Sequence, residues 1–124
     1  MFLLCLSSVL CKMVTDPLFG KKAWKSTMLE AEFHDQVAQV MRLNGWSVYS
    51  VPDSRRVSLA GYPDITAWRG TRLIFAELKR EKGRTSPAQD DVLSELRQIP
   101  CAEVYLWKPS DWDSIVDITK RGNK

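Results

Sequence analysis

The sequence predicts a single α/β domain in which a small mixed β-sheet is flanked by helices. The chain has 124 residues, of which 44% are hydrophobic, which is enough for one packed core but not for two. Two apolar runs, 65–68 and 73–76, flank Gly70-Thr71, as in a hairpin with a tight turn. Helical and strand patterns alternate elsewhere, and together they predict the order α-β-β-β-α-β-α.

The predicted domain covers residues 28–120 and leaves residues 1–27 as an N-terminal extension. Residues 1–14 are apolar, but no basic region precedes them, no clear cleavage site follows, and they are too short to span a bilayer. We therefore expect no membrane partner, with an export or membrane role of this segment as the alternative. Cys5, Cys11 and Cys101 form no CxxC pair, which indicates neither zinc nor disulfides and suits the cytoplasm.

The first half of the domain is expected to contain one helix and three strands. Apolar residues recur at helical spacing from about Thr27, a possible cap, to Asn44-Gly45, which supplies a stop. A first strand, 46–51, ends at Pro52-Asp53 and is followed by the hairpin. The apolar residues that define the helix are Leu29, Phe33, Val37, Val40 and Met41.

The second half is expected to contain a helix, a strand and a terminal helix. Ser86-Pro87-Ala88-Gln89 has the pattern of a capping box with proline at the first helical position, and Pro100 forbids the continuation of that helix beyond about Gln98. A last strand, 101–107, and a short terminal helix that starts within 110–113 complete the domain.

The hairpin turn fixes which residues face one another. If Arg69 lies opposite Arg72, Asp64 falls opposite Glu77, with Cβ atoms about 4.5–5.5 Å apart. The alternation of a strand then places Lys79 on the same face as Glu77. Two carboxylates so close repel each other unless a cation offsets the cost, and oxygen ligands suit Mg²⁺ or Mn²⁺ better than zinc. A metal held by Asp64 and Glu77 beside a lysine is suited to hydrolysis of a phosphodiester.

Two further residues are candidates for this site, each with an alternative. Glu30 lies next to the apolar stripe of the first helix and could reach the hairpin as a third metal ligand or an orienting base. The alternative, favoured when Glu30 is considered alone, is that it only stabilises the helix N-terminus electrostatically. Gln89 has a capping role, so any role in the site is additional. His34, the only histidine, is one turn beyond Glu30 and receives no assignment.

Basic residues gather around the hairpin although the net charge is only +3. Residues 55–84 contain eight basic side chains against three acidic ones, as expected for a partner that is a polyanion such as nucleic acid. The alternative is a solvated sheet edge whose charged side chains prevent pairing with strands of other molecules. The eight are Arg55, Arg56, Arg69, Arg72, Lys79, Arg80, Lys82 and Arg84.

Six separated motifs, taken in order, give the chain a resemblance to a known family. It resembles the viral-type replication-repair nuclease (VRR-NUC) domain of the PD-(D/E)xK nuclease superfamily over about residues 28–118. The motifs are Glu30-x-x-Phe33 leading to Gly45-Trp46, Ser54-Arg55-Arg56, Gly61-x-Pro63-Asp64, Glu77-x-Lys79, Ser86-Pro87-x-Gln89 and Trp107-x-Pro109.

The resemblance implies a restriction-endonuclease-like fold and a Mg²⁺- or Mn²⁺-dependent deoxyribonuclease, often selective for branched or flap DNA and often a homodimer, in a phage or its bacterial host cell. Its acidic site would be Glu30, Asp64 and Glu77, with the Leu78 backbone carbonyl as a further metal ligand. Lys79 would act on the attacking water or the phosphate, and Gln89 would support the site. The DNA backbone would be held by Arg55, Arg56, Arg80, Lys82 and Arg84.

Two other functions remain open from the sequence. A catalytically silent DNA-binding module on the same scaffold would bind DNA whether or not metal is present. An interaction subunit that docks through exposed tryptophans would not bind DNA at all. The acidic set disfavours both, because a pure binder of polyanions gains nothing from carboxylates that face its ligand.

Overall fold

The computed structural model describes residues 28–51 and 58–122. Arg55 and Arg56, the N-terminal extension, Cys5 and Cys11 therefore lie outside the described residues. The elements, in order, are α3 (Glu30–Leu43), β1 (Ser47–Ser50), β2 (Ile65–Arg69), β3 (Arg72–Leu78), α4 (Pro87–Arg97), β4 (Ala102–Trp107), the 3-10 turn η2 (Pro109–Asp111) and α5 (Trp112–Lys120). The predicted α/β class and order of elements are confirmed. No helix within the described ranges is long and apolar enough to cross a bilayer.

The four strands form one mixed sheet in the order β1-β2-β3-β4. The β1-β2 and β2-β3 pairs are antiparallel, whereas β3 and β4 are parallel. Parallel neighbours need a crossover connection, and α4 supplies it. The segment that follows Glu77 therefore leaves the sheet, forms a helix over one of its faces and returns as the edge strand.

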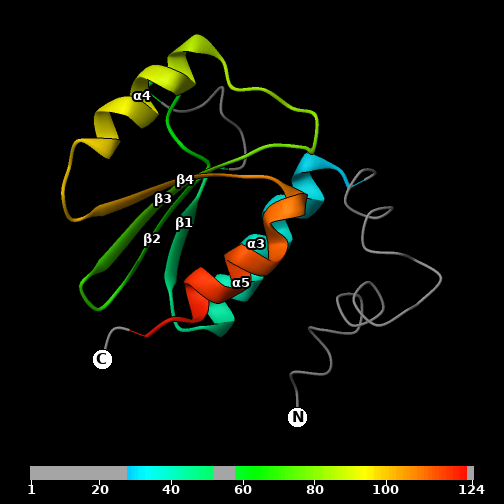
Figure 1. The fold of residues 1–124 in the computed structure, drawn as a ribbon, viewed down its shortest axis with the longest axis vertical. Coiled ribbons are helices and arrows are strands. Elements are labelled where there is room, and N and C mark those ends of the chain that lie inside the picture. Colours follow the sequence, from blue (N-terminus) through cyan, green and yellow to red (C-terminus); the bar gives the residue numbers. More distant parts are fainter. Residues whose placement is uncertain (1–27, 52–57, 123–124) are drawn as a thin grey trace.

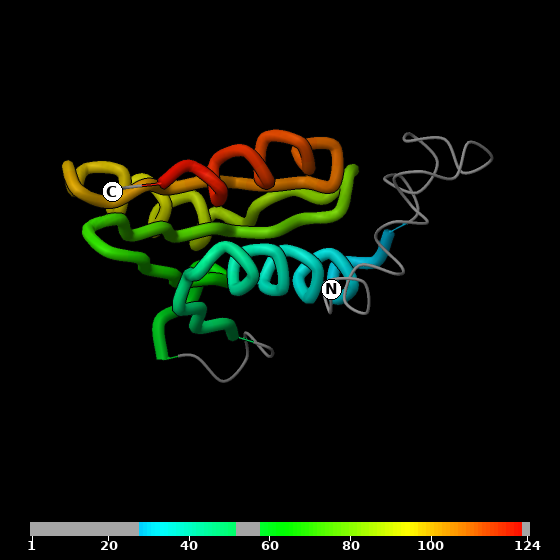
Figure 2. The backbone as a smooth tube through the Cα atoms, turned by 90° about the horizontal axis from the view of Figure 1, so that it is seen from below, coloured from blue at the N-terminus to red at the C-terminus, as the bar shows by residue number. Residues whose placement is uncertain are grey.

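Within residues 28–51 and 58–122, helices cover both faces of the sheet, two on one face and one on the other (Figure 1; Figure 2). Helices α3 and α5 lie side by side along one face, while α4 lies on the other side of the sheet (Figure 1; Figure 2). Alternation along β2 and β3 directs one set of apolar side chains toward α3 and α5. This core contains Phe33, Val37, Met41, Trp46, Ile65, Ala67, Ile74, Ala76, Leu78, Trp107, Trp112 and Ile115. The opposite set of β3 residues, which includes Glu77, faces α4.

The hairpin has the predicted register. Arg69 pairs with Arg72 and Ile65 pairs with Ala76, so the next step outward brings Asp64 opposite Glu77. Gly70 has a φ of +61°, a conformation that glycine adopts without steric cost. The prediction that a two-residue turn sets the positions of both acids is confirmed.

Helix starts agree with the sequence at α4 and α5 and differ at α3. At α4, Ser86 and Gln89 exchange the predicted capping bonds, with Gln89 N–H donating to Ser86 Oγ at 3.2 Å. The prediction for the first helix was wrong, because α3 starts at Glu30 rather than near Thr27, and Leu29 N–H donates to Glu32 Oε1 at 3.0 Å. The terminal α-helix begins at Trp112, after the 3-10 turn.

Arg69 and Arg72 bind groups on the core face of the sheet, so they do not add to the basic residues around the predicted site. Both guanidinium carbons lie 4.8 Å from the centre of the Trp46 ring, and Arg72 also forms two 2.7 Å hydrogen bonds to Glu103. The backbone carbonyls that accept from the two arginines belong to Asn44, Ile118, Thr119 and Arg121. Because helix ends leave carbonyls unpaired, the arginines satisfy the C-termini of α3 and α5.

Candidate active site

Glu77 is the buried centre of the candidate site. It is 1% exposed near the end of β3, on the face of the sheet that α4 covers. Gln89 on α4 donates its side-chain N–H to Glu77 Oε2 at 2.8 Å, and Lys79 Nζ lies 3.5 Å from the same oxygen. The other oxygen, Oε1, is buried and has no hydrogen-bond partner among the described residues. The predicted placement of Lys79 on the face of Glu77 is confirmed.

Asp64 is held at the start of β2 by backbone hydrogen bonds on both sides. Its carbonyl accepts from Val51 N–H at 3.0 Å, which extends the pairing with β1. Its side-chain Oδ2 accepts from Leu78 N–H at 2.9 Å, which fixes the carboxylate beside the end of β3. The Leu78 side chain itself is fully buried in the core. The Leu78 carbonyl therefore stays a predicted ligand, while its N–H has a defined role in orienting Asp64.

The surroundings of Asp64 and Glu77 disfavour ionisation of both carboxyl groups at once. Burial, followed by the charge of the neighbouring Asp64, raises the pKa of Glu77 to about 8, although the Lys79 ammonium opposes this rise. A proton or a cation near Glu77 would relieve this repulsion. Two neighbouring carboxyl groups that share one ammonium, with a buried oxygen that has no hydrogen-bond partner among the described residues, form an arrangement that a bound cation would stabilise.

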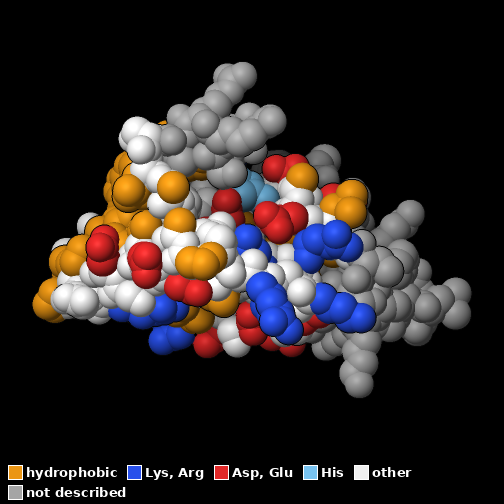
Figure 3. All heavy atoms as spheres, turned by 90° about the horizontal axis from the view of Figure 1, so that it is seen from above, with side chains coloured by type: hydrophobic (Ala, Val, Ile, Leu, Met, Phe, Trp, Pro, Cys, Tyr) orange, Lys and Arg blue, Asp and Glu red, His pale blue; other side chains and the backbone are white. Residues whose placement is uncertain are grey.

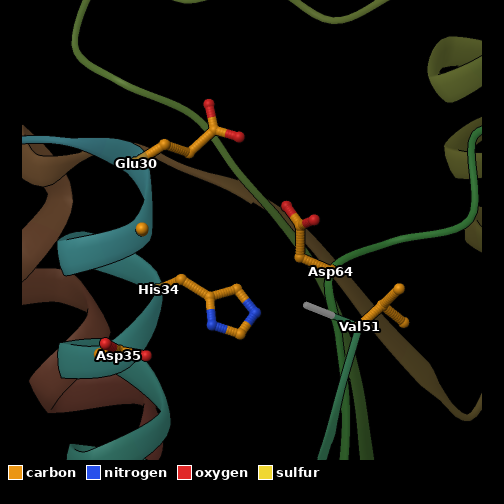
Figure 4. A pocket seen from close by; sticks show the side chains of 6 residues that line it. Glu30, His34, Asp35, Val51 and Asp64 are labelled. Atoms are coloured by element: carbon orange, nitrogen blue, oxygen red, sulfur yellow. The ribbon is translucent and has the colours of Figure 1, made fainter. Parts of the chain in front are cut away.

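These side chains border a shared cavity of about 310 Å³. Asp64, Glu77 and Lys79 come from the hairpin, Gln89 from α4, and Glu30 from the first residue of α3. Glu30 is exposed, and its carboxylate extends toward the Asp64 side of the site (Figure 4). The structure thus brings all five predicted catalytic residues to one cavity. The remaining lining residues are Ala60, Gly61, Tyr62, Ser86 and Ala88.

Gly61 lets the loop before Asp64 pack directly on α4, a role that sequence reasoning missed. It has a φ of +87°, and a Cβ atom there would lie 2.4 Å from the Ala88 carbonyl oxygen and 2.8 Å from Gln89 N. Only glycine allows so close an approach in this conformation. This contact positions the first turn of α4, and with it Gln89, over Glu77. A glycine three residues before the aspartate was the available signal.

His34 faces the site from α3. Its ring is directed into a second cavity, of about 360 Å³, that Glu30 and Asp64 also line (Figure 4). Its Nε2 atom is buried and has no hydrogen-bond partner among the described residues. Sequence reasoning left this residue without a role, although its position one turn after Glu30 was a usable signal.

A basic loop follows Lys79 at the edge of the site. Arg80, Lys82 and Arg84 are exposed, as phosphate contacts require, and the loop is tied to η2 because Ser110 N–H donates to Glu81 Oε1 at 2.9 Å. Acidic and basic side chains gather beside the histidine on this end of the molecule (Figure 3). Basic and acidic side chains therefore lie beside one another on this face of the molecule (Figure 3).

The residues present fit Mg²⁺ or Mn²⁺ better than they fit Zn²⁺. Asp64 and Glu77 offer oxygen ligands, and Glu77 Oε1 is a buried oxygen that lacks a partner among the described residues. No group of three or more His, Cys, Asp or Glu side chains in the described part of the chain is placed to hold an ion by itself. Mg²⁺ in phosphoryl-transfer sites typically takes one or two carboxylates and completes its coordination with water and substrate phosphate.

Comparison with known proteins adds no relative. No protein-family model matches the chain, and neither the curated proteins nor the solved structures contain a match. The resemblance to VRR-NUC domains therefore rests on the sequence motifs and stays a prediction.

Proposed function

We propose that this chain is a metal-dependent deoxyribonuclease that hydrolyses DNA phosphodiester bonds and prefers branched or flap DNA. One observation carries the proposal: Asp64 and Glu77 face each other in an open cavity, with Lys79 Nζ 3.5 Å from a Glu77 carboxylate whose second oxygen has no partner in the described structure. The VRR-NUC resemblance supports the same activity and adds the preference for branched DNA.

Asp64, Glu77 and Glu30 would hold Mg²⁺ or Mn²⁺. When bound, such an ion would offset the charge of the scissile phosphate and make a water molecule more acidic. The hydrogen bond from Leu78 N–H fixes the direction of Asp64, and the one from Gln89 fixes that of Glu77. Rigidly placed ligands of this kind need no reorganisation during the reaction.

Lys79 would act on the reacting phosphate or on the water that attacks it. Its side chain is 15% exposed, which keeps the ammonium close to Glu77 while leaving it accessible from the cavity. As a cation it would stabilise the additional negative charge on the phosphate oxygens, and as a neutral amine it would accept a proton from water. Both roles predict a loss of cleavage when Lys79 is removed.

The loop after Lys79 would bind the DNA backbone. Arg80, Lys82 and Arg84 are exposed on the loop that follows Lys79, and Arg55 and Arg56 are predicted to add to them from outside the described residues. Contacts to phosphate position a duplex without reading its sequence. We therefore attribute the proposed selectivity to the shape of the DNA.

Cleavage of flap, splayed and four-way DNA with Mn²⁺ tests the proposal. Glu77→Gln, which keeps the shape of the buried side chain, and Lys79→Ala should each abolish measurable cutting. Glu95→Ala, which removes an exposed carboxylate from α4, is the matched control and should cut like the wild type. Undiminished cutting by both site variants would refute the proposal.

A catalytically silent DNA-binding module is the second candidate, favoured by the basic loop alone. It predicts DNA affinity that EDTA leaves unchanged and a steep dependence on salt. Wild-type protein that binds the three DNA forms in this way, and cuts none of them at any Mn²⁺ concentration, would support the module over the nuclease.

A further inference from the structure

Two cavities meet at Asp64, and the second one has a different chemistry. The cavity of about 310 Å³ reaches Glu77 and Lys79, whereas the cavity of about 360 Å³ extends toward α3 and is lined by His34 and Asp35. Glu30 and Asp64 line both. A ligand bound between Glu30 and Asp64 can therefore be contacted from the α3 side as well as from the hairpin.

The His34 imidazole is an unused polar group at this second cavity. Its outer ring edge points toward Asp64 and Val51 (Figure 4). Nε2 is shielded from solvent and lacks a partner among the described residues. A buried polar atom left without a partner destabilises the structure, so a ligand that contacts it would remove that cost.

Charge decides which ligand fits. The cavity is lined by three carboxylate side chains, those of Glu30, Asp35 and Asp64, and none of its described lining residues is a lysine or an arginine. A phosphate or another anion would be repelled there, whereas a cation would be attracted. The imidazole nitrogen adds a ligand that first-row transition ions accept and that Mg²⁺, which demands oxygen, does not favour.

We propose that His34 binds the divalent cation on the α3 side of Asp64 and makes this site prefer a first-row transition ion, such as Mn²⁺, over Mg²⁺. The inference rests on the proposed nuclease function, because Glu30 and Asp64 are its predicted acidic residues. His34 and Asp64 would be the principal protein ligands, with water completing the coordination. Glu30 is exposed at the start of α3 and can turn toward the ion by a rotamer change.

Electron spin-echo measurements of Mn²⁺ on DNA-free, untagged protein test this directly. His34 is the only histidine in the chain, so protein labelled with ¹⁵N-histidine carries the label at one residue. We expect a ¹⁵N coupling of the size found for directly bound imidazole. We expect the coupling to be absent when unlabelled protein is used. Mn²⁺ that binds without any ¹⁵N coupling, or that does not bind at all, overturns the inference.

Competition between metals supplies the second measurement. In His34→Gln the ratio of Mn²⁺ affinity to Mg²⁺ affinity should fall about tenfold, which is the effect of losing about 1.4 kcal/mol of differential binding. Lys120→Gln, at the exposed end of α5, should leave the ratio unchanged. An unchanged ratio in a folded His34→Gln protein counts against the inference. The labelled wild-type protein provides a test that does not depend on the folding of the variant.

Failure of this inference can be told apart from failure of the nuclease proposal. Metal-dependent cutting that Glu77→Gln abolishes, without ¹⁵N coupling, refutes only the role of His34. A clear ¹⁵N coupling in a protein that cuts none of the DNA forms refutes only the nuclease.

Discussion

Gln89 donates a 2.8 Å hydrogen bond to Oε2 of Glu77 while its own side-chain oxygen accepts from Ser86 N–H at 2.8 Å. One amide group thus caps α4 and orients a buried carboxylate. The two ends of the amide have different roles: the oxygen accepts from Ser86 N–H, and only the NH₂ group can donate to Glu77. The stability of the helix and the geometry of the site are coupled through this side chain.

Substitutions of Gln89 should separate these two roles. Gln89→Glu keeps an acceptor for Ser86 N–H but removes the donor to Glu77 and adds a like charge, so cleavage should fall roughly 10- to 100-fold while the cap of α4 is retained. Gln89→Ala removes both bonds and should also cost about 1 kcal/mol of stability. Steady-state cleavage rates and thermal melts check both variants. Full activity in Gln89→Glu would show that the hydrogen bond to Glu77 is dispensable.

The raised pKa of Glu77 predicts that, without metal, the stability of the protein falls as pH rises. Its pKa is raised from 4.5 to about 8 in the folded state, so the folded chain holds the proton more tightly than the unfolded chain. In EDTA the free energy of unfolding should therefore fall as pH rises through this window, by up to about 1.4 kcal/mol per pH unit. Glu77→Gln should lack this decline and be the more stable protein at pH 8.

Urea unfolding at pH 5, 6.5 and 8 checks the sign of this effect. Adding Mg²⁺ or Mn²⁺ should restore the stability of the wild type at pH 8, because a ligand that binds only the folded state stabilises it. Glu77→Gln should gain less from either ion. Parallel pH profiles for the two proteins in EDTA would show that Glu77 does not carry the raised pKa.

The acidic pair was predictable because strand pairing has a period of two. Once Gly70-Thr71 is recognised as the turn, pairing of Arg69 with Arg72 determines that Asp64 meets Glu77. The position of Gln89 was predictable as a cap, but its bond to Glu77 was not. That bond depends on where the crossover helix packs on the sheet, which local sequence patterns do not specify.

The number of basic residues near the hairpin predicted the site less well than the strand register did, because a count ignores the face on which each side chain lies. Arg69 and Arg72 were counted with Arg80 and Lys82, yet alternation already places Arg72 on the face opposite to Glu77. Their helix-end partners lie far away in the sequence and could not be inferred. The direction of His34 likewise depends on how α3 packs, so only its spacing from Glu30 was visible.

Gly61→Ala should damage the site by moving the first turn of α4. The new Cβ would lie 2.4 Å from the Ala88 carbonyl oxygen, so the backbone must shift, and the positive φ adds strain. Gly45→Ala is a matched control with a φ of +90° but a nearest contact of 3.6 Å. Both variants should lose about 1 kcal/mol from backbone strain. Only Gly61→Ala should lose more stability and also most of its cleavage activity, as urea unfolding and cleavage assays can show.

Arg72 and Arg80 should behave as two different kinds of basic residue. Arg72→Met removes two 2.7 Å bonds to the half-buried Glu103 and two to backbone carbonyls at the end of α5, so it should cost about 2–4 kcal/mol of stability. Arg80→Met removes an exposed side chain and should change stability by less than about 0.5 kcal/mol. It should instead weaken DNA binding and reduce the salt slope by about 1.

The pKa of Glu103 gives an independent check on Arg72. The hydrogen bonds from Arg72 lower the pKa of Glu103 in the folded state, so this pair stabilises the protein above the ordinary glutamate pKa of 4.5, and the contribution disappears as pH falls through the lowered value. Arg72→Met should therefore remove part of the acid-induced loss of stability, whereas Arg80→Met should retain all of it. Acid titrations followed by circular dichroism measure both. Equal acid sensitivity in the two variants would show that the Arg72–Glu103 pair does not contribute to stability.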